Sequence, residues 1–90
     1  MTEIVLIVDD DPIQRRLLDA HVARMGLRPL HCDGGRAALD ALGGRNGGQI
    51  AAVVLDLMMP DKSGMEVMAE MRRNRFDVPI VVQTAKGSID

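Results

Sequence analysis

Three carboxylates and one hydroxyl stand directly after apolar runs of this chain, in positions where they could carry phosphoryl chemistry. Asp9 and Asp10 follow the run "IVLIV", and Asp56 follows "IAAVVL". Thr84 follows a third run, "VPIVVQ". Carboxylates that are close together repel one another and resist ionising together when they are removed from water. A bound cation would offset that repulsion, so these positions indicate a cation site.

The residue types in these positions favour Mg²⁺. No histidine or cysteine stands at metal-ligand spacing, and a set of oxygen ligands selects a hard cation that also binds phosphate oxygens. Asp56 stands alone at the end of its run and is the better candidate nucleophile, since a carboxylate can form an aspartyl-phosphate. The Thr84 hydroxyl could donate a hydrogen bond to a phosphoryl oxygen and so act as a switch.

Apolar runs that alternate with helical patterns predict an α/β fold with a parallel sheet. The continuous β-branched run at residues 4–8 predicts a central strand that is covered on both faces. Pro29 cannot donate to a ladder, so the strand at residues 27–32 is expected at a sheet edge. Further strands are expected at residues 50–55 and 78–83. In an open parallel sheet, ligands bind beyond the carboxyl ends of the strands, which is where the acidic positions fall.

Cap signals set the bounds of the first predicted helix. Asp11 is the expected N-cap, Pro12 the first helical residue, and Gly26 the residue that ends the helix. Helical spacing of apolar residues gives this helix a face that is expected to pack on the sheet. That face consists of Ile13, Leu17, Leu18, Val22 and Met25.

Two more helices are predicted further along the chain. The turn "DGG" leads into a short alanine- and leucine-rich helix that ends near Leu42. Ser63 and Glu66 have the spacing of a capping box and begin a third helix. One face of that helix is expected to pack in the core, and it consists of Met65, Met68 and Met71.

The composition is that of an ordinary soluble chain of ninety residues, with 47% hydrophobic residues and a formal charge of -2. A chain of this length makes at most one domain. The charge balance favours neither nucleic acid nor a membrane surface. No run has the length of a membrane-spanning helix and the N-terminus lacks a signal-peptide pattern, so a cytoplasmic location is expected. Cys32 is the single cysteine and is expected to fill apolar space.

Three motifs fall in order at the predicted strand ends: "VDDDP", "LDLMMPDKSG" and "TAKGSID". In these motifs the chain resembles the receiver domain of two-component response regulators, and the resemblance covers all ninety residues. It implies a flavodoxin-like, doubly wound parallel sheet of the chemotaxis-regulator type, with strand order 2-1-3-4-5. The motif "TAKGSID" is also similar to receivers of sigma-54-dependent regulators, which implies a role in transcription regulation.

The resemblance also implies a role for each site residue. Asp56 would accept a phosphoryl group from a histidine kinase. Mg²⁺ would be bound by Asp9, Asp10, Asp56 and the backbone carbonyl of Met58. Thr84 would be the switch residue that passes the signal to an output domain or a downstream protein. The implied function is a phosphoacceptor in a phosphorelay, with self-phosphorylation and self-dephosphorylation as its only reactions and no enzymatic turnover.

Receiver domains continue through a fourth helix, a fifth strand that precedes a phosphate-binding lysine, and a fifth helix. None of these is found in this sequence, so residues 1–90 are expected to form a single receiver domain that is incomplete at its C-terminus. Without a fifth strand, the strand at residues 78–83 would present an apolar edge with unpaired backbone groups. Such a chain is expected to pair with a second copy through Ile80 to Gln83.

Three other functions are compatible with parts of the pattern. In a phosphatase that resembles the haloacid dehalogenase family, Asp9 would be the nucleophile and Asp11 the general acid, but Pro12 stands where a small polar residue is expected. A flavodoxin-like cofactor binder would share the sheet order, although the acidic first loop would repel a flavin phosphate. A receiver-shaped interaction module that is never phosphorylated is compatible with the absent fifth-strand lysine.

Overall fold

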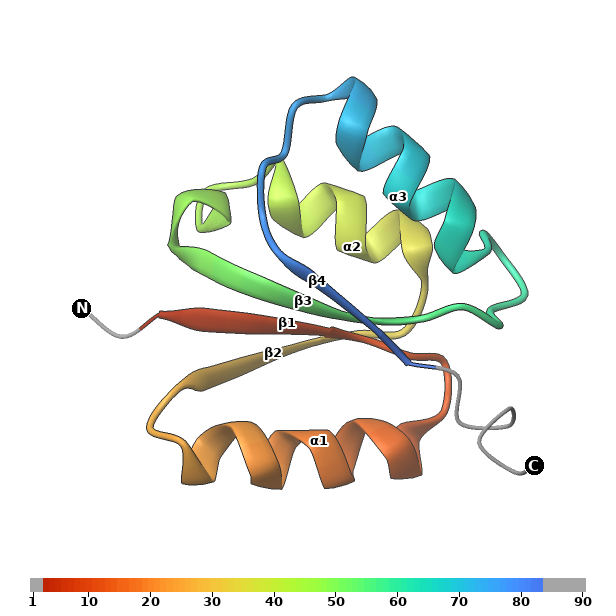
Figure 1. Ribbon diagram of the computed structural model, residues 1–90. Coiled ribbons are helices and arrows are strands. Elements are labelled where there is room, and N and C mark those ends of the chain that lie inside the picture. Colours follow the sequence, from red (N-terminus) through yellow and green to blue (C-terminus); the bar gives the residue numbers. More distant parts are fainter. Residues whose placement is uncertain (1–2, 84–90) are drawn as a thin grey trace.

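The computed structural model describes residues 3–83 of the chain (Figure 1). Helix α1 covers one face of a four-stranded parallel sheet, and α2 and α3 cover the other. The strand order is β2-β1-β3-β4, which confirms the doubly wound fold and the 2-1-3-4 part of the implied order. The elements along the chain are β1 (Ile4–Val8), α1 (Pro12–Arg24), β2 (Arg28–Cys32), α2 (Gly35–Leu42), a 3-10 helix η1 (Gly47–Gln49), β3 (Ile50–Asp56), α3 (Gly64–Arg73) and β4 (Ile80–Gln83).

β1 is a central strand, and it is apolar on both faces. All five of its residues are buried, and Leu6 and Ile7 have no exposed surface. It lies between β2 and β3, and Pro29 of β2 lies opposite Val5. β2 is at the edge of the sheet, where a residue without an N–H is tolerated. Both strand predictions are confirmed.

The larger part of the core lies between the sheet and helices α2 and α3. Leu6, Val53 and Leu55 point into it from the sheet and have no exposed surface. Cys32 at the end of β2 is buried in the same cluster, as a small apolar residue was predicted to be. The amide that follows β1, that of Asp9, donates to the Cys32 carbonyl at 3.1 Å and extends the β1–β2 ladder by one bond.

Side-chain caps start α1 and α3 as the sequence predicts. Asp11 Oδ1 accepts a hydrogen bond from the Ile13 amide at 3.0 Å. At α3 the Ser63 hydroxyl accepts from the Glu66 amide at 3.2 Å, and Glu66 Oε1 accepts from the Ser63 amide at 2.8 Å. These bonds satisfy amides that the first turn of a helix leaves without an intrahelical partner.

Only part of the predicted apolar face of α1 packs on the sheet. Val22 is buried and Leu18 is half-buried against Val5 and Ile7 of β1. The prediction was wrong for the other three members of the face: two of them lie about 100° or more around the helix from Leu18 and Val22, and Met25 is the C-cap residue that follows the last residue of α1. The three residues are Ile13, Leu17 and Met25, which are 69%, 55% and 68% exposed.

The predicted methionine face of α3 was also wrong in part. Met71 is buried, but Met65 is 64% exposed. Three residues advance a helix by about 300°, so positions 65 and 71 lie about 120° apart and cannot both face the core. The buried line of α3 runs instead through Gly64, Val67 and Met71.

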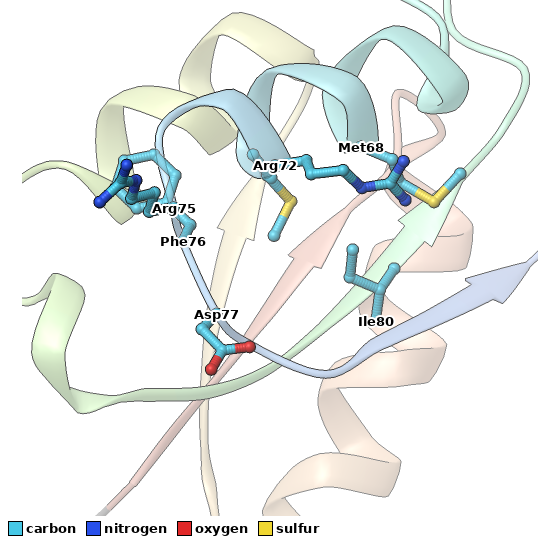
Figure 2. Close-up of a pocket in the computed structure, with 7 residues that line it drawn as sticks. Met68, Arg72, Arg75, Phe76, Asp77 and Ile80 are labelled. Atoms are coloured by element: carbon cyan, nitrogen blue, oxygen red, sulfur yellow. The ribbon is translucent and has the colours of Figure 1, made fainter.

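A hollow of about 440 Å³ lies between the C-terminal end of α3 and the segment that leads into β4 (Figure 2). Its lining is mixed and consists of Met68, Met71, Arg72, Arg75, Phe76, Asp77 and Ile80. It lies at the start of β4, whereas the predicted site residues follow the ends of strands. The hollow therefore contains none of the candidate site residues. Within residues 3–83, no helix has the length and hydropathy that a membrane crossing requires.

Candidate cation and phosphoryl site

The ends of β1 and β3 bring three carboxylates together. These strands are neighbours with Val8 opposite Leu55, so Asp9 and Asp56 stand at the same edge of the sheet. One carboxylate oxygen from each of Asp9, Asp10 and Asp56 lies within 4.8 Å of the other two. Asp9 and Asp56 are 3% and 9% exposed, whereas Asp10 is exposed. We call these three residues the acidic cluster.

Backbone amides orient the two buried carboxylates of the acidic cluster. Asp9 Oδ1 accepts a hydrogen bond from the Asp11 amide at 2.9 Å, and Asp56 Oδ1 accepts one from the Met58 amide at 3.1 Å. Each bond ties a carboxylate to its own loop and uses one of its two oxygens. Among residues 3–83, no lysine, arginine or histidine forms an ion pair with the cluster. No basic side chain in that part of the chain therefore neutralises the cluster through an ion pair.

Burial raises the pKa of Asp9 above its ordinary value, and the charges of Asp56, Asp10 and Asp11 raise it further. The hydrogen bond from the Asp11 amide lowers this pKa but does not cancel the other effects. A cation beside the cluster would favour the ionised carboxylate instead. The folded chain thus carries an unfavourable electrostatic interaction that a cation relieves.

The residues present fit Mg²⁺. Their donor atoms are carboxylate oxygens, and the exposed Asp10 leaves space for water ligands. The Met58 amide contacts Asp56, which places this residue beside the cluster, while its carbonyl as a ligand stays a prediction. Thr84 lies outside the described residues, so its switch role also stays a prediction.

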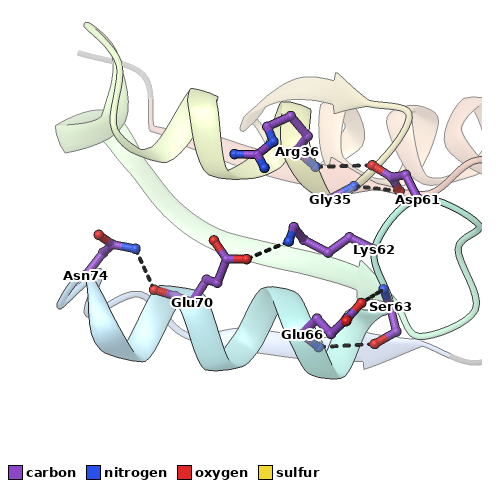
Figure 3. A network of polar contacts seen from close by, with 8 residues as sticks. All are labelled: Gly35, Arg36, Asp61, Lys62, Ser63, Glu66, Glu70 and Asn74. Carbon is purple, nitrogen blue, oxygen red and sulfur yellow. Dashed lines mark hydrogen bonds and ion pairs between the residues drawn. The ribbon is translucent and has the colours of Figure 1, made fainter.

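A long-range contact that the sequence did not indicate joins the loop after Asp56 to α2 (Figure 3). The Asp61 carboxylate accepts hydrogen bonds from the amides of Gly35 at 3.2 Å and Arg36 at 3.3 Å. These bonds lower the pKa of Asp61. The N-cap residue of α2 is Gly34, which has no side chain with which to cap the helix. Asp61 therefore caps α2 from a distant part of the chain. The start "DGGR", which has no capping side chain at Gly34, was the available sign that a distant residue caps this helix.

Close packing fixes the same loop, residues 57–63, on both sides. A Cβ at Gly34 would lie 2.8 Å from Asp61 Oδ2, so no larger residue fits there without moving the carboxylate. Toward α3, Lys62 Nζ donates to Glu70 Oε2 at 2.6 Å and lowers the pKa of Glu70 (Figure 3). The loop that follows Asp56 is thus attached to both helices of that face.

Fold and site together define a class of protein: an open parallel α/β domain with a cluster of carboxylates at the carboxyl ends of its central strands. Residues 5–90 match the family described as response regulator receiver domain. The chain therefore belongs to the receiver domains of two-component response regulators, as its motifs implied. This assignment does not favour the phosphatase alternative.

Two curated relatives illustrate the similarity. The transcriptional regulatory protein TcrA of Mycobacterium tuberculosis is 36% identical over 85 residues, which are 94% of this chain and 32% of that protein. The response regulator MprA of Mycolicibacterium vanbaalenii is 38% identical over 85 residues, which are 94% of this chain and 36% of that protein. The chain thus spans about a third of the length of these relatives.

Solved receiver structures have the same fold. The response regulator TrrA of Thermotoga maritima, in complex with Mg²⁺ and BeF, is 33% identical with a TM-score of 0.82. That match covers 93% of this chain and 70% of the other. A response regulator receiver protein from Pseudomonas putida is 26% identical with a TM-score of 0.84, over 93% of this chain and 69% of the other.

Proposed function

We propose that this receiver is a Mg²⁺-dependent phosphoacceptor in which Asp56 takes a phosphoryl group from a histidine kinase. The observation that carries the proposal is the acidic cluster, whose oxygens lie within 4.8 Å of one another at one edge of the sheet. Membership of the receiver family supports it. The structure of the relative TrrA in complex with Mg²⁺ and BeF is consistent with the same cation in this chain.

In the proposed reaction, a carboxylate oxygen of Asp56 attacks the phosphorus of a phosphohistidine. The phosphorus–nitrogen bond breaks, the imidazole nitrogen keeps the electron pair, and an aspartyl-phosphate forms. Mg²⁺, when bound, supplies the positive charge that offsets repulsion between the anionic nucleophile and the phosphoryl oxygens. Asp9 and Asp10 hold that charge in place, and the Met58 amide orients the Asp56 carboxylate through its 3.1 Å hydrogen bond.

The remaining parts of the proposal concern the signal. The Met58 carbonyl is a further Mg²⁺ ligand, and the Thr84 hydroxyl meets the new phosphoryl group and passes the change to an output domain or downstream protein. The relatives include transcriptional regulatory proteins, which supports transcription regulation as the output. The proposed location is the cytoplasm, and this segment contacts neither nucleic acid nor a membrane. We also propose that residues 1–90 belong to a single receiver domain.

The site of phosphorylation can be mapped directly. The chain is incubated with acetyl phosphate and Mg²⁺, the acyl phosphate is reduced with borohydride, and the position that becomes homoserine is found by peptide mass spectrometry. Label at Asp56 is the expected result, and it should disappear when EDTA replaces Mg²⁺. Label at Asp9 would overturn the proposal in favour of an aspartate-nucleophile phosphatase. A folded, Mg²⁺-binding chain without label would indicate an interaction module that is not phosphorylated.

The outer edge of β4 supports a second proposal, that a chain of these ninety residues forms a homodimer through this strand. In residues 3–83, β4 pairs only with β3, so its other edge has no strand against it. Val81 and Val82 are 57% and 45% exposed, and the segment Ile80–Gln83 carries no charge. An uncharged apolar edge with free backbone groups favours the addition of another strand.

Light scattering across a range of concentrations tests the β4 edge. The wild-type chain is expected to form a dimer as its concentration rises, and Val81→Lys is expected to stay monomeric because a charge blocks strand addition. Leu17→Lys is the matched control, since it places the same charge at an exposed apolar residue of α1, away from the β4 edge. A monomer at all concentrations whose β4 amides are protected from hydrogen exchange would contradict the proposal.

A further inference from the structure

Arg15 reaches from the first turns of α1 back to the loop that carries the acidic cluster. Its Nη1 donates a hydrogen bond to the backbone carbonyl of Asp9 at 2.7 Å, and its own amide donates to the Asp11 carbonyl at 3.0 Å. The side chain is half-buried. Arg15 therefore contacts the loop through main-chain oxygens, and among residues 3–83 its guanidinium forms no ion pair with the cluster.

Asp9 is held by hydrogen bonds at its amide, its carbonyl and its side chain. Its amide donates to the Cys32 carbonyl at 3.1 Å, its side chain accepts from the Asp11 amide at 2.9 Å, and its carbonyl accepts from Arg15. That carbonyl belongs to the peptide group that also contains the Asp10 amide, and the peptide group is planar. The hydrogen bond from Arg15 thus fixes the orientation of the peptide plane between Asp9 and Asp10.

Asp10 depends on this plane more than the other carboxylates do. The Asp9 and Asp56 side chains are buried and accept backbone hydrogen bonds. Asp10 is exposed, and within residues 3–83 its side chain accepts no hydrogen bond from the protein. Its position in the cluster is set by the backbone alone.

We infer that Arg15 is a positioning residue for the cation site: it orients the Asp9–Asp10 peptide so that both carboxylates face one ion. The inference rests on the proposed function, because it takes the acidic cluster to be the Mg²⁺ site. Arg15 acts through the backbone and does not touch the cation or the phosphoryl group. In this role it resembles the outer-shell groups that orient metal ligands and whose loss weakens binding about 10–100-fold.

The positioning role and a purely electrostatic role predict opposite results. A positive charge near a cation site opposes cation binding, so its removal alone would tighten the binding of Mg²⁺. Loss of the hydrogen bond to the Asp9 carbonyl would weaken it, because the carboxylates would have to be ordered when the ion binds. The direction of the change in Kd therefore distinguishes the two roles.

The experiment measures the Kd for Mg²⁺ by NMR titration of backbone amides, with urea unfolding of each variant alongside. Arg15→Met is expected to weaken Mg²⁺ binding about tenfold. Arg16→Met is the matched control, since it makes the same change at the adjacent exposed arginine, and its Kd should stay at the wild-type value. Arg15→Lys keeps the charge but loses the planar guanidinium, and an approximately threefold weaker Kd is expected.

The possible results test the proposed function and the role of Arg15 separately. Absence of Mg²⁺ binding by the wild-type chain would overturn the proposed function and the inference with it. Wild-type binding with an unchanged or tighter Kd in Arg15→Met would overturn the inference alone. The titration follows resonances of the folded state, so a variant that is only less stable keeps its Kd. If Arg15→Met does not fold, a wild-type Kd in Arg15→Lys overturns the positioning role and an approximately threefold weaker Kd supports it.

Discussion

Replacing Asp9 by asparagine is expected to stabilise the metal-free protein and to weaken Mg²⁺ binding at least about tenfold. Asp9 is 3% exposed, and burial together with its acidic neighbours raises its pKa, so its charge is unfavourable in the folded chain. Asparagine keeps the oxygen that accepts the hydrogen bond from the Asp11 amide. The loss of repulsion should be worth on the order of 1 kcal/mol without Mg²⁺. Urea unfolding with and without Mg²⁺ measures both effects.

The pH dependence of stability tests whether the stability gained by Asp9→Asn comes from the charge of Asp9. The pKa of Asp9 is raised above its unfolded value of 3.8. At pH values between these two pKa values, the folded chain therefore holds a proton at Asp9 that the unfolded chain has released. Stability should therefore fall as pH rises from 3.8 through the raised pKa, and Asp9→Asn should lack this loss. Asp61 and Glu70, whose pKa values are lowered from 3.8 and 4.5, act in the opposite direction, since their stabilisation is lost as pH falls through and below those values.

Asp11→Asn is the matched control for Asp9→Asn. It removes one charge from the same run of aspartates, and its side-chain oxygen can still accept from the Ile13 amide. Asp11 is exposed and lies outside the acidic cluster. The charge of Asp11 is the weakest of the effects that raise the pKa of Asp9, so its replacement should change the stability without Mg²⁺ and the Mg²⁺ affinity much less than Asp9→Asn does. Equal effects of the two substitutions would show that overall charge, and not the cluster, governs the response.

The substitution Gly64→Ala should destabilise the fold by about 3 kcal/mol, because α3 starts too close to the strand that carries Asp56. A Cβ at Gly64 would lie 2.8 Å from both the Asp56 carbonyl oxygen and Leu57 Cα. Both are backbone atoms, which cannot rotate away as a flexible side chain could. The end of β3 or the start of α3 would have to move, so Mg²⁺ binding should weaken as well.

Gly48→Ala provides the comparison for Gly64→Ala in urea unfolding. Gly48 lies in η1, and a Cβ there meets nothing within 4 Å. Alanine in such a position reduces the freedom of the unfolded chain, so stability should be unchanged or about 0.5 kcal/mol higher. Similar free energies of unfolding for the two variants would mean that the tight contact at Gly64 relaxes without cost.

Parts of the site were predictable from the sequence because they depend on local pattern and on one property of parallel sheets. The run Ile4–Val8 is apolar at every position, which is typical of a strand buried on both faces. Adjacent parallel strands present their carboxyl ends at one edge, so Asp9 and Asp56 were expected to meet, and they do. Local caps such as Asp11 and Ser63 followed from short-range spacing alone.

Other contacts of the site were not predictable, because their partners are distant or their direction is not encoded in a pattern. Asp61 caps the amides of Gly35 and Arg36, which are 26 and 25 residues away. Arg15 bonds a carbonyl six residues before it, outside the helix that it belongs to. Sequence spacing alone also could not show how far around α1 the sheet reaches, and so Leu17 was assigned wrongly to the buried face.

The burial of Cys32 makes its thiol a probe of local opening beside the acidic cluster. The thiol is 6% exposed, and burial raises its pKa to about 11, so the reactive thiolate is scarce in the folded protein. Alkylation of Cys32 therefore reports how often the end of β2 separates from its neighbours. The Cys32 carbonyl accepts from the Asp9 amide, so the same opening releases the loop of the acidic cluster. The chain has no tryptophan or tyrosine that could report on this opening by fluorescence, and the rate of thiol modification measures it instead.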